Sequence, residues 1–145
     1  MPEINTTGAL QIAGQLYEYV DVLGEKMFGQ NHMKKDVHQF ALAVGIAGNK
    51  ILESEHYVET PSTTIGYPNP LPRTNPASQL ATYDDIEAIL SLIAASGKEA
   101  NAQTASEYVN GGLQFLKEIG YENQTEESLD RFFEIFPHIN PEGDD

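Results

Sequence analysis

Histidines are the residues of this chain best suited to acid–base chemistry or metal binding. His32, His38, His56 and His138 form neither an i, i+4 pair nor the His-Glu-x-x-His pattern of a helical zinc site. His38, which follows Asp36 closely, is the best single candidate for a ligand or a general base. Its helical context nevertheless favours a partly exposed helix residue. The sequence therefore predicts no metal site.

The glycine-rich segment and the paired acids also have structural interpretations. Gly45–Lys50 lacks the Gly-Lys-Ser/Thr ending and the preceding strand of a phosphate-binding loop, which favours helix packing and a helix end. Asp84–Asp85 and Glu126–Glu127 lie where the first turn of a helix favours negative charge. With no cysteine and no recognisable nucleophile motif, we expect a non-enzyme with no catalytic residues and no cofactor.

Size and charge narrow the class of protein further. The chain has 145 residues, 40% of them hydrophobic, which suits one folded domain. Its net charge of −14 would repel nucleic acid at long range, so direct nucleic-acid binding is not expected. No apolar run approaches the ~18 to 20 residues of a membrane span, and no leader pattern is evident, so we expect a cytoplasmic protein.

Negative charge is concentrated near the end of the chain. Residues 121–145 carry eight acidic side chains and one basic side chain, half of the net charge. The alternatives are a solvated face, adaptation to a salty host, or a surface that docks on a basic partner. Candidate partner-binding residues, drawn from this region and the Pro-rich segment, are Glu122, Glu126, Glu127, Asp130, Glu134, Tyr67 and Arg73.

The elements that would position these residues are predicted to be helices. Apolar residues recur at three- and four-residue spacing between capping residues and stop signals. The five predicted helices, given by cap and stop, run from Thr6 or Thr7 to Gly29, Asp36 to Gly48, Thr82 to Gly97, Thr104 to Gly120, and Thr125 to Pro137. The Gly111–Gly112 pair inside the fourth helix predicts a close helix contact or a kink.

The predicted fold is all-α, a compact bundle of about five helices. Residues 53–81, which contain five of the eight prolines, form a long Pro-rich loop or strap between the second and third helices. We expect a single domain over residues 1–139 and a frayed acidic tail over residues 140–145. The wide apolar faces make a homodimer plausible.

Two segments resemble a known family. Lys35-Asp36-Val37-His38-Gln39-Phe40-Ala41-Leu42-Ala43-Val44-Gly45 and Glu107-Tyr108-Val109-Asn110-Gly111-Gly112-Leu113-Gln114-Phe115-Leu116 resemble small helical accessory proteins of bacterial and archaeal DNA phosphorothioation gene clusters. Val37 and Val109 depart from the family pattern, which has Phe and Ala there, and Phe is displaced to position 40.

The resemblance implies a non-catalytic accessory protein of DNA modification and anti-phage defence. It implies action through protein contacts and no catalytic residues. A basic DNA-processing protein is then the expected partner. The alternatives are an acidic DNA mimic that inhibits a nucleic-acid enzyme, and a small hydrolase. The hydrolase would need a pocket that holds His38 or a carboxylate with a shifted pKa.

Overall fold

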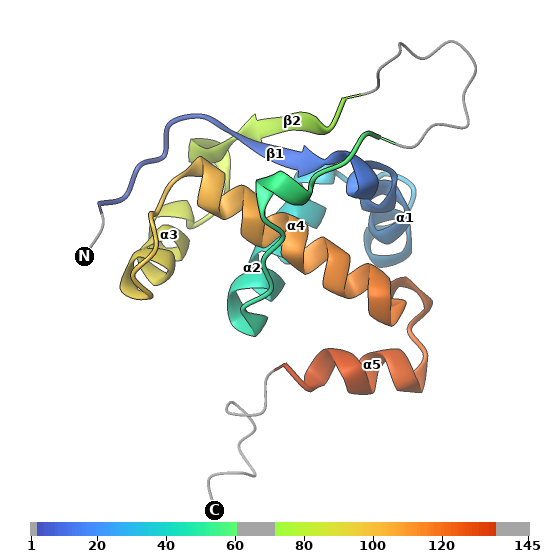
Figure 1. Cartoon of the computed structure of the whole chain (residues 1–145). Helices are drawn as coiled ribbons and strands as arrows, with labels where there is room; N and C mark the ends of the chain where they lie inside the picture. Colours follow the sequence, from blue (N-terminus) through green and yellow to red (C-terminus); the bar gives the residue numbers. More distant parts are fainter. Residues whose placement is uncertain (1–2, 61–71, 136–145) are drawn as a thin grey trace, which may run out of the picture.

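The computed structural model describes residues 3–60 and 72–135. This part of the chain contains five α-helices and a two-stranded antiparallel sheet, which lies along the top of the molecule in Figure 1. The elements are β1 (Ala9–Ala13), α1 (Tyr17–Phe28), α2 (Lys34–Gly48), β2 (Thr74–Gln79), α3 (Ile86–Ala95), α4 (Ala102–Ile119) and α5 (Glu126–Phe133). The protein is thus mostly helical, and the prediction of a strictly all-α fold is wrong.

β1 occupies residues that were predicted to form the first turns of the first helix. Thr6 and Thr7 do not cap a helix, because the chain from Ala9 to Ala13 is extended and pairs with β2. Leu10 and Ile12 are both buried, which is the two-residue alternation of a strand with one face on a core. The helix begins only at Tyr17 and ends, as predicted, at Gly29.

The Pro-rich segment contains the second strand. Residues 53–81 were predicted to lack regular structure, whereas Thr74–Gln79 is β2, with Pro76 opposite Gln11. Residues 61–71, which include the candidate partner-binding residue Tyr67, lie outside the described residues. The predicted tail and the predicted stop at Pro137 lie outside them as well.

Three further predicted helix caps are wrong. Asp36 lies inside the first turn of α2, which already begins at Lys34. Asn101, not Thr104, caps α4, because its Oδ1 accepts a hydrogen bond from the Thr104 N–H at 3.0 Å. The Thr82 hydroxyl donates to the Gln79 carbonyl at 2.7 Å within a short 3-10 turn, so α3 starts after that turn.

Other helix ends are as predicted. The Thr125 side chain caps α5 by accepting from the Ser128 N–H at 3.0 Å. Gly120 ends α4 in the left-handed conformation, with φ of 68°.

Close contact between α2 and α4 organises the centre of the molecule. A Cβ on Gly112 would overlap the Ala41 carbonyl oxygen, and one on Gly45 would overlap the Tyr108 carbonyl oxygen. Only glycine therefore permits this approach, which confirms the close contact predicted from the glycine pair. α4 also packs against β1 on one side and α5 on the other, so it links the sheet to α5 (Figure 1).

Buried hydrophobic side chains from the sheet and from all five helices join into one core. Of the helices described, none is both long enough and apolar enough to cross a lipid bilayer.

Candidate functional site

Four of the predicted partner-binding residues lie together on α5 and at its end. Glu126, Glu127, Asp130 and Glu134 are all exposed. The Thr125 side chain caps the N-terminus of α5, and the two glutamates of the first turn interact favourably with the helix dipole. These local interactions explain why an acidic helix forms here. The structure therefore brings these four carboxylates onto one accessible element.

Aromatic side chains attach α5 to the rest of the protein. Phe132 is buried, and its ring centroid lies 4.7 Å from that of Tyr121 and 6.2 Å from that of Phe40. The ring of Phe133 lies edge-on against that of Phe132, with 5.3 Å between the centroids, and Phe133 is 61% exposed. At helical spacing Phe133 shares a face with Asp130 and Glu126. The outer face of α5 thus combines one large apolar side chain with a rim of carboxylates.

Glu122 has a different environment from the other predicted acids. It is partly buried and accepts a hydrogen bond from the Tyr19 hydroxyl at 2.7 Å. Burial, together with this bond to Glu122 and its negative charge, raises the pKa of Tyr19. Glu122 therefore ties α1 to the segment before α5, and its predicted role in partner binding finds no separate support.

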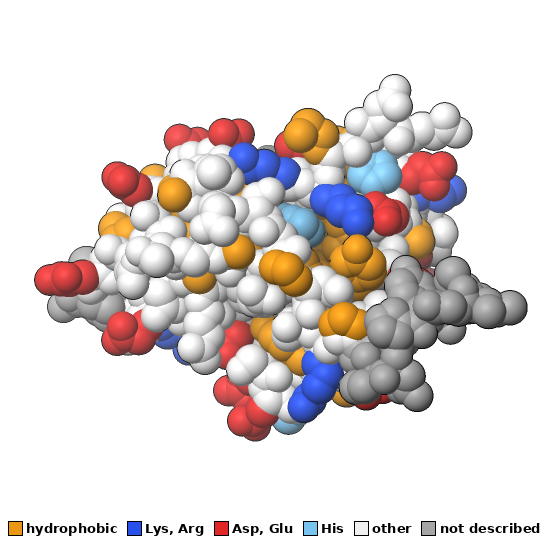
Figure 2. Space-filling view, turned by 90° about the horizontal axis from the view of Figure 1, so that it is seen from above, with side chains coloured by type: hydrophobic (Ala, Val, Ile, Leu, Met, Phe, Trp, Pro, Cys, Tyr) orange, Lys and Arg blue, Asp and Glu red, His pale blue; other side chains and the backbone are white. Residues whose placement is uncertain are grey.

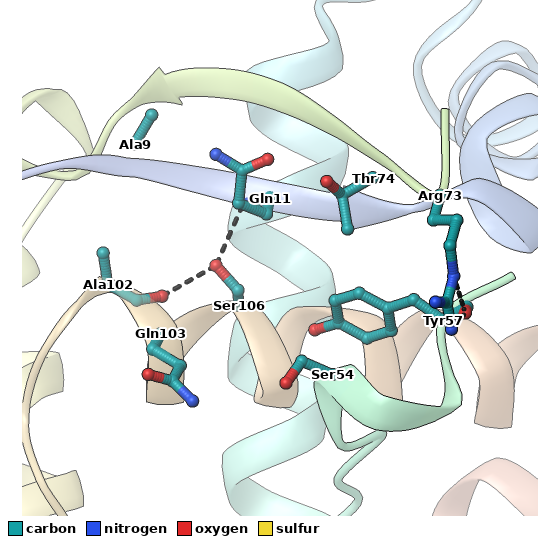
Figure 3. Close-up of a pocket in the computed structure, with 9 residues that line it drawn as sticks. All are labelled: Ala9, Gln11, Ser54, Tyr57, Arg73, Thr74, Ala102, Gln103 and Ser106. Carbon is teal, nitrogen blue, oxygen red and sulfur yellow. Dashed lines mark hydrogen bonds between the residues drawn. The ribbon is translucent and has the colours of Figure 1, made fainter. Parts of the chain in front are cut away.

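Arg73 lies at the edge of a pocket of about 440 Å³ between the sheet and α4 (Figure 3). It is the only charged residue among the described residues that line this pocket. Its Nε donates to the Tyr57 carbonyl oxygen at 2.9 Å. The Ser106 hydroxyl donates to the Ala102 carbonyl at 2.7 Å and accepts from the Gln11 N–H at 2.9 Å. These groups are engaged in holding the fold, which leaves the pocket mostly neutral.

Asn110, one helical turn after Ser106, forms the main polar link between α4 and β1. Its Oδ1 accepts from the Ala13 N–H at 2.8 Å, and its Nδ2 lies 2.9 Å from the Gln11 carbonyl oxygen and 3.0 Å from the Tyr57 hydroxyl. Asn110 is fully buried. The edge of β1 that does not face β2 is thus paired by side chains of α4, which stabilises an otherwise marginal two-stranded sheet.

A second pocket, of about 260 Å³, lies between α1, α2 and β2. Its polar lining consists of Lys34, Lys35, His38, Asn75 and Ser78. Sequence reasoning missed this pocket because β2 forms one of its walls. The available signal was two lysines and a histidine within about one helical turn, in a chain of net charge −14.

His38 is buried in this pocket, with only 5% of its surface exposed, so the prediction of a partly exposed residue is wrong. Its Nδ1 lies 3.1 Å from the Tyr83 hydroxyl. Burial, and to a smaller extent the positive charge of Lys34, lowers the pKa of His38 to about 4, although the charge of Asp21 acts in the opposite direction. The ring is therefore neutral at physiological pH.

One group of side chains has the composition of a cation site. Glu53, Glu55 and His56 place potential ligand atoms within 4.8 Å of one another, and all three residues are exposed. His56 Nε2 lies 3.8 Å from Glu53 and 3.6 Å from Glu55. Exposed acidic groups of this kind are common on protein surfaces without a metal ion, so the cluster does not by itself indicate a metal site.

Comparison with known proteins gives no match: no family model, no curated protein and no solved structure is similar to this chain. Its function is therefore inferred from its own residues.

Proposed function

We propose that this protein is a non-catalytic interaction protein that docks on a basic partner protein through the outer face of α5. The observation that carries the proposal is Phe133, 61% exposed on the same face as Asp130 and Glu126. An exposed aromatic side chain inside a charged rim is typical of a binding surface, since the aromatic group contributes affinity and the charges contribute orientation.

The same face is a poor match for duplex DNA. The eight residues of α5 span about 12 Å, the length of three to four base pairs. A mimic of DNA needs carboxylates spaced along an elongated surface, whereas α5 places a phenylalanine among its acids. The short length of α5 and its exposed phenylalanine favour the accessory-protein hypothesis over the DNA-mimic alternative.

The hydrolase alternative finds one of its conditions met, because His38 does lie in a pocket. However, a histidine whose pKa is about 4 is a weak general base at neutral pH. Its placement in a pocket supports binding better than catalysis.

The resemblance of two segments to phosphorothioation accessory proteins favours a partner from a DNA-modification or anti-phage assembly. A cytoplasmic location and a homodimer stay predictions of the sequence.

The experiment that tests the proposal uses the tagged full-length protein to capture partners from its native host. A captured protein is then purified, and its affinity is measured by isothermal titration calorimetry. Phe133→Ala should weaken binding about tenfold or more, as expected for a central aromatic contact. The matched control is Leu92→Ala on α3, where the leucine is 60% exposed, and it should bind like the wild type.

Charge is tested separately. The triple variant Glu126→Gln, Asp130→Asn and Glu134→Gln should bind more weakly and lose most of the salt dependence of association. The matched control neutralises three exposed acids elsewhere, Glu18, Glu25 and Glu87. Wild-type affinity in both α5 variants would refute the proposal.

A further inference from the structure

The pocket around His38 gathers positive charge and hydrogen-bond donors in an acidic protein. Lys34 and Lys35 lie in the first turn of α2, where the helix dipole adds to their charge. Their ammonium groups lie over aromatic rings, Lys34 at 4.8 Å from the Tyr17 centroid and Lys35 at 5.4 Å from the Tyr83 centroid. These contacts hold both cations close to the pocket.

A hydrogen bond joins His38 to Tyr83. The Tyr83 hydroxyl lies 3.1 Å from His38 Nδ1. Hydrogen bonding to Ser78 lowers the pKa of Tyr83 and partly offsets the effect of burial. In the tautomer in which the hydroxyl donates to Nδ1, the neutral ring carries its hydrogen on Nε2. Nε2 has no hydrogen-bond partner among the described residues, and His38 lines the pocket, so this N–H is available to a ligand.

One carboxylate faces the same region. Asp21 lies 3.7 Å from Lys34 Nζ and 3.2 Å from His32 Nε2. The charge of Asp21 is thus shared between His32 and Lys34. Lys35 has no acidic partner among the described residues. The net charge around the pocket is therefore positive, in contrast to the net charge of the whole chain.

The remaining walls are apolar or aromatic. Ile12, Val20, Pro76 and Ala77 line the pocket together with the ring of Tyr17. Seen from the side of the sheet, histidine and lysine side chains stand beside hydrophobic ones near the middle of this face, while most acidic side chains lie toward its margins (Figure 2). The pocket therefore joins a cationic part to an apolar part.

We propose that this pocket binds a small phosphate monoester, with the phosphoryl group held by Lys34, Lys35 and the His38 Nε2–H, and the organic part packed against Tyr17 and β2. Two ammonium groups with a neutral N–H donor suit a dianion better than a carboxylate, which carries one charge. The apolar walls distinguish a monoester from free phosphate. A volume of about 260 Å³ limits the ligand to a small molecule. This inference is independent of the α5 surface.

Titration calorimetry of the full-length protein at pH 7 with phenyl phosphate tests the proposal. We expect saturable binding with Kd below about 1 mM, weaker binding of inorganic phosphate, and weaker binding of benzoate. Lys35→Ala should weaken phenyl phosphate binding about tenfold, the effect of losing one charged contact. The control Lys98→Ala removes an exposed lysine that follows α3 and should leave phenyl phosphate binding unchanged.

Nitrogen NMR of the histidines provides a second readout that does not depend on a variant. Phenyl phosphate should shift the protonated Nε2 resonance of His38 and leave that of His56 unchanged. Absence of saturable binding at about 10 mM phenyl phosphate, or equal binding by Lys35→Ala, would overturn the proposal. Benzoate binding as tightly as phenyl phosphate would overturn the assignment to a phosphate, and equal binding of inorganic phosphate would overturn the assignment to a monoester.

Discussion

Replacing Asn110 by alanine tests whether the polar link between α4 and β1 stabilises the fold. The change leaves the buried Ala13 N–H and the Gln11 carbonyl without the partners that Asn110 supplies at 2.8 and 2.9 Å. Tyr57, the third partner, lines a pocket, where its hydroxyl can turn to water. Asn110 Nδ2 also lies 2.9 Å from the Ser106 carbonyl oxygen, which stays within the helical turn of α4 after the substitution.

The expected cost follows from these groups. The Ala13 N–H is fully enclosed, so losing its acceptor costs about 2 to 3 kcal/mol, and the partly buried Gln11 carbonyl adds about 1 kcal/mol. Alanine recovers about 0.5 kcal/mol through its higher helix propensity. The net loss in free energy of unfolding is about 3 kcal/mol, a large share of the stability of a domain of this size.

Urea denaturation followed by far-ultraviolet circular dichroism measures this loss. With a slope of about 1.5 to 2 kcal/mol per molar urea, the midpoint should fall by about 1.5 to 2 M. The matched control is Gln103→Ala, which removes an exposed amide from the same helix and should shift the midpoint little. A loss below about 1 kcal/mol in Asn110→Ala would refute the assignment of Asn110 as the link that holds the sheet on α4.

Three further predictions concern helix packing, the pH dependence of stability, and one hydrogen bond. Gly112→Ala should lose about 2 kcal/mol of stability in the same urea assay, because its Cβ would overlap the Ala41 carbonyl; a stabilised variant would contradict the close helix contact. The pKa of His38 is about 4 in the folded protein and near 6.5 when unfolded, so the unfolded chain binds more protons between these values. Stability should accordingly fall as pH drops from about 6.5 to 4, by about 3 kcal/mol more than in His38→Gln, and parallel curves for the two proteins would argue against a buried neutral ring. Tyr19→Phe removes the hydrogen bond of 2.7 Å to Glu122 and should cost about 1 kcal/mol at neutral pH in urea, whereas an unchanged midpoint would show that this bond does not stabilise the fold.

Features fixed by neighbouring residues could be predicted from the sequence. The cap at Thr125, the end of α1 at Gly29 and the end of α4 at Gly120 depend on side chains and backbone freedom within one turn. The exposed acidic side chains of α5 and its end follow from such a local pattern, whereas their role in partner binding stays a prediction.

The sheet depends on contacts between distant residues and could not be predicted. Thr74–Gln79 has no alternation of apolar and polar side chains, and it contains a proline, so its own pattern argues against a strand. The segment is extended because β1 pairs with it. β1 was hidden in turn, since Leu10, Ala13 and Leu16 also fit helical spacing.

Both pockets were missed for the same reason. Each lies between the sheet and the helices, so neither exists in a bundle without strands. The burial of His38 is likewise a result of tertiary packing, because Tyr83, which is distant in sequence, reaches its Nδ1. Only the clustering of Lys34 and Lys35 near this histidine was visible beforehand.

The two proposed surfaces share no residue, so they can be occupied at the same time. α5 packs below α4 and the sheet above it (Figure 1). Charges are screened over about 8 Å at physiological salt, so the carboxylates of α5 act mainly on groups close to them. The stability of the sheet and that of α5 are nevertheless linked, because α4 contacts both β1 and α5. Substitutions on the outer face of α5 should therefore leave the His38 pocket intact, whereas loss of Asn110 releases the sheet that forms one of its walls.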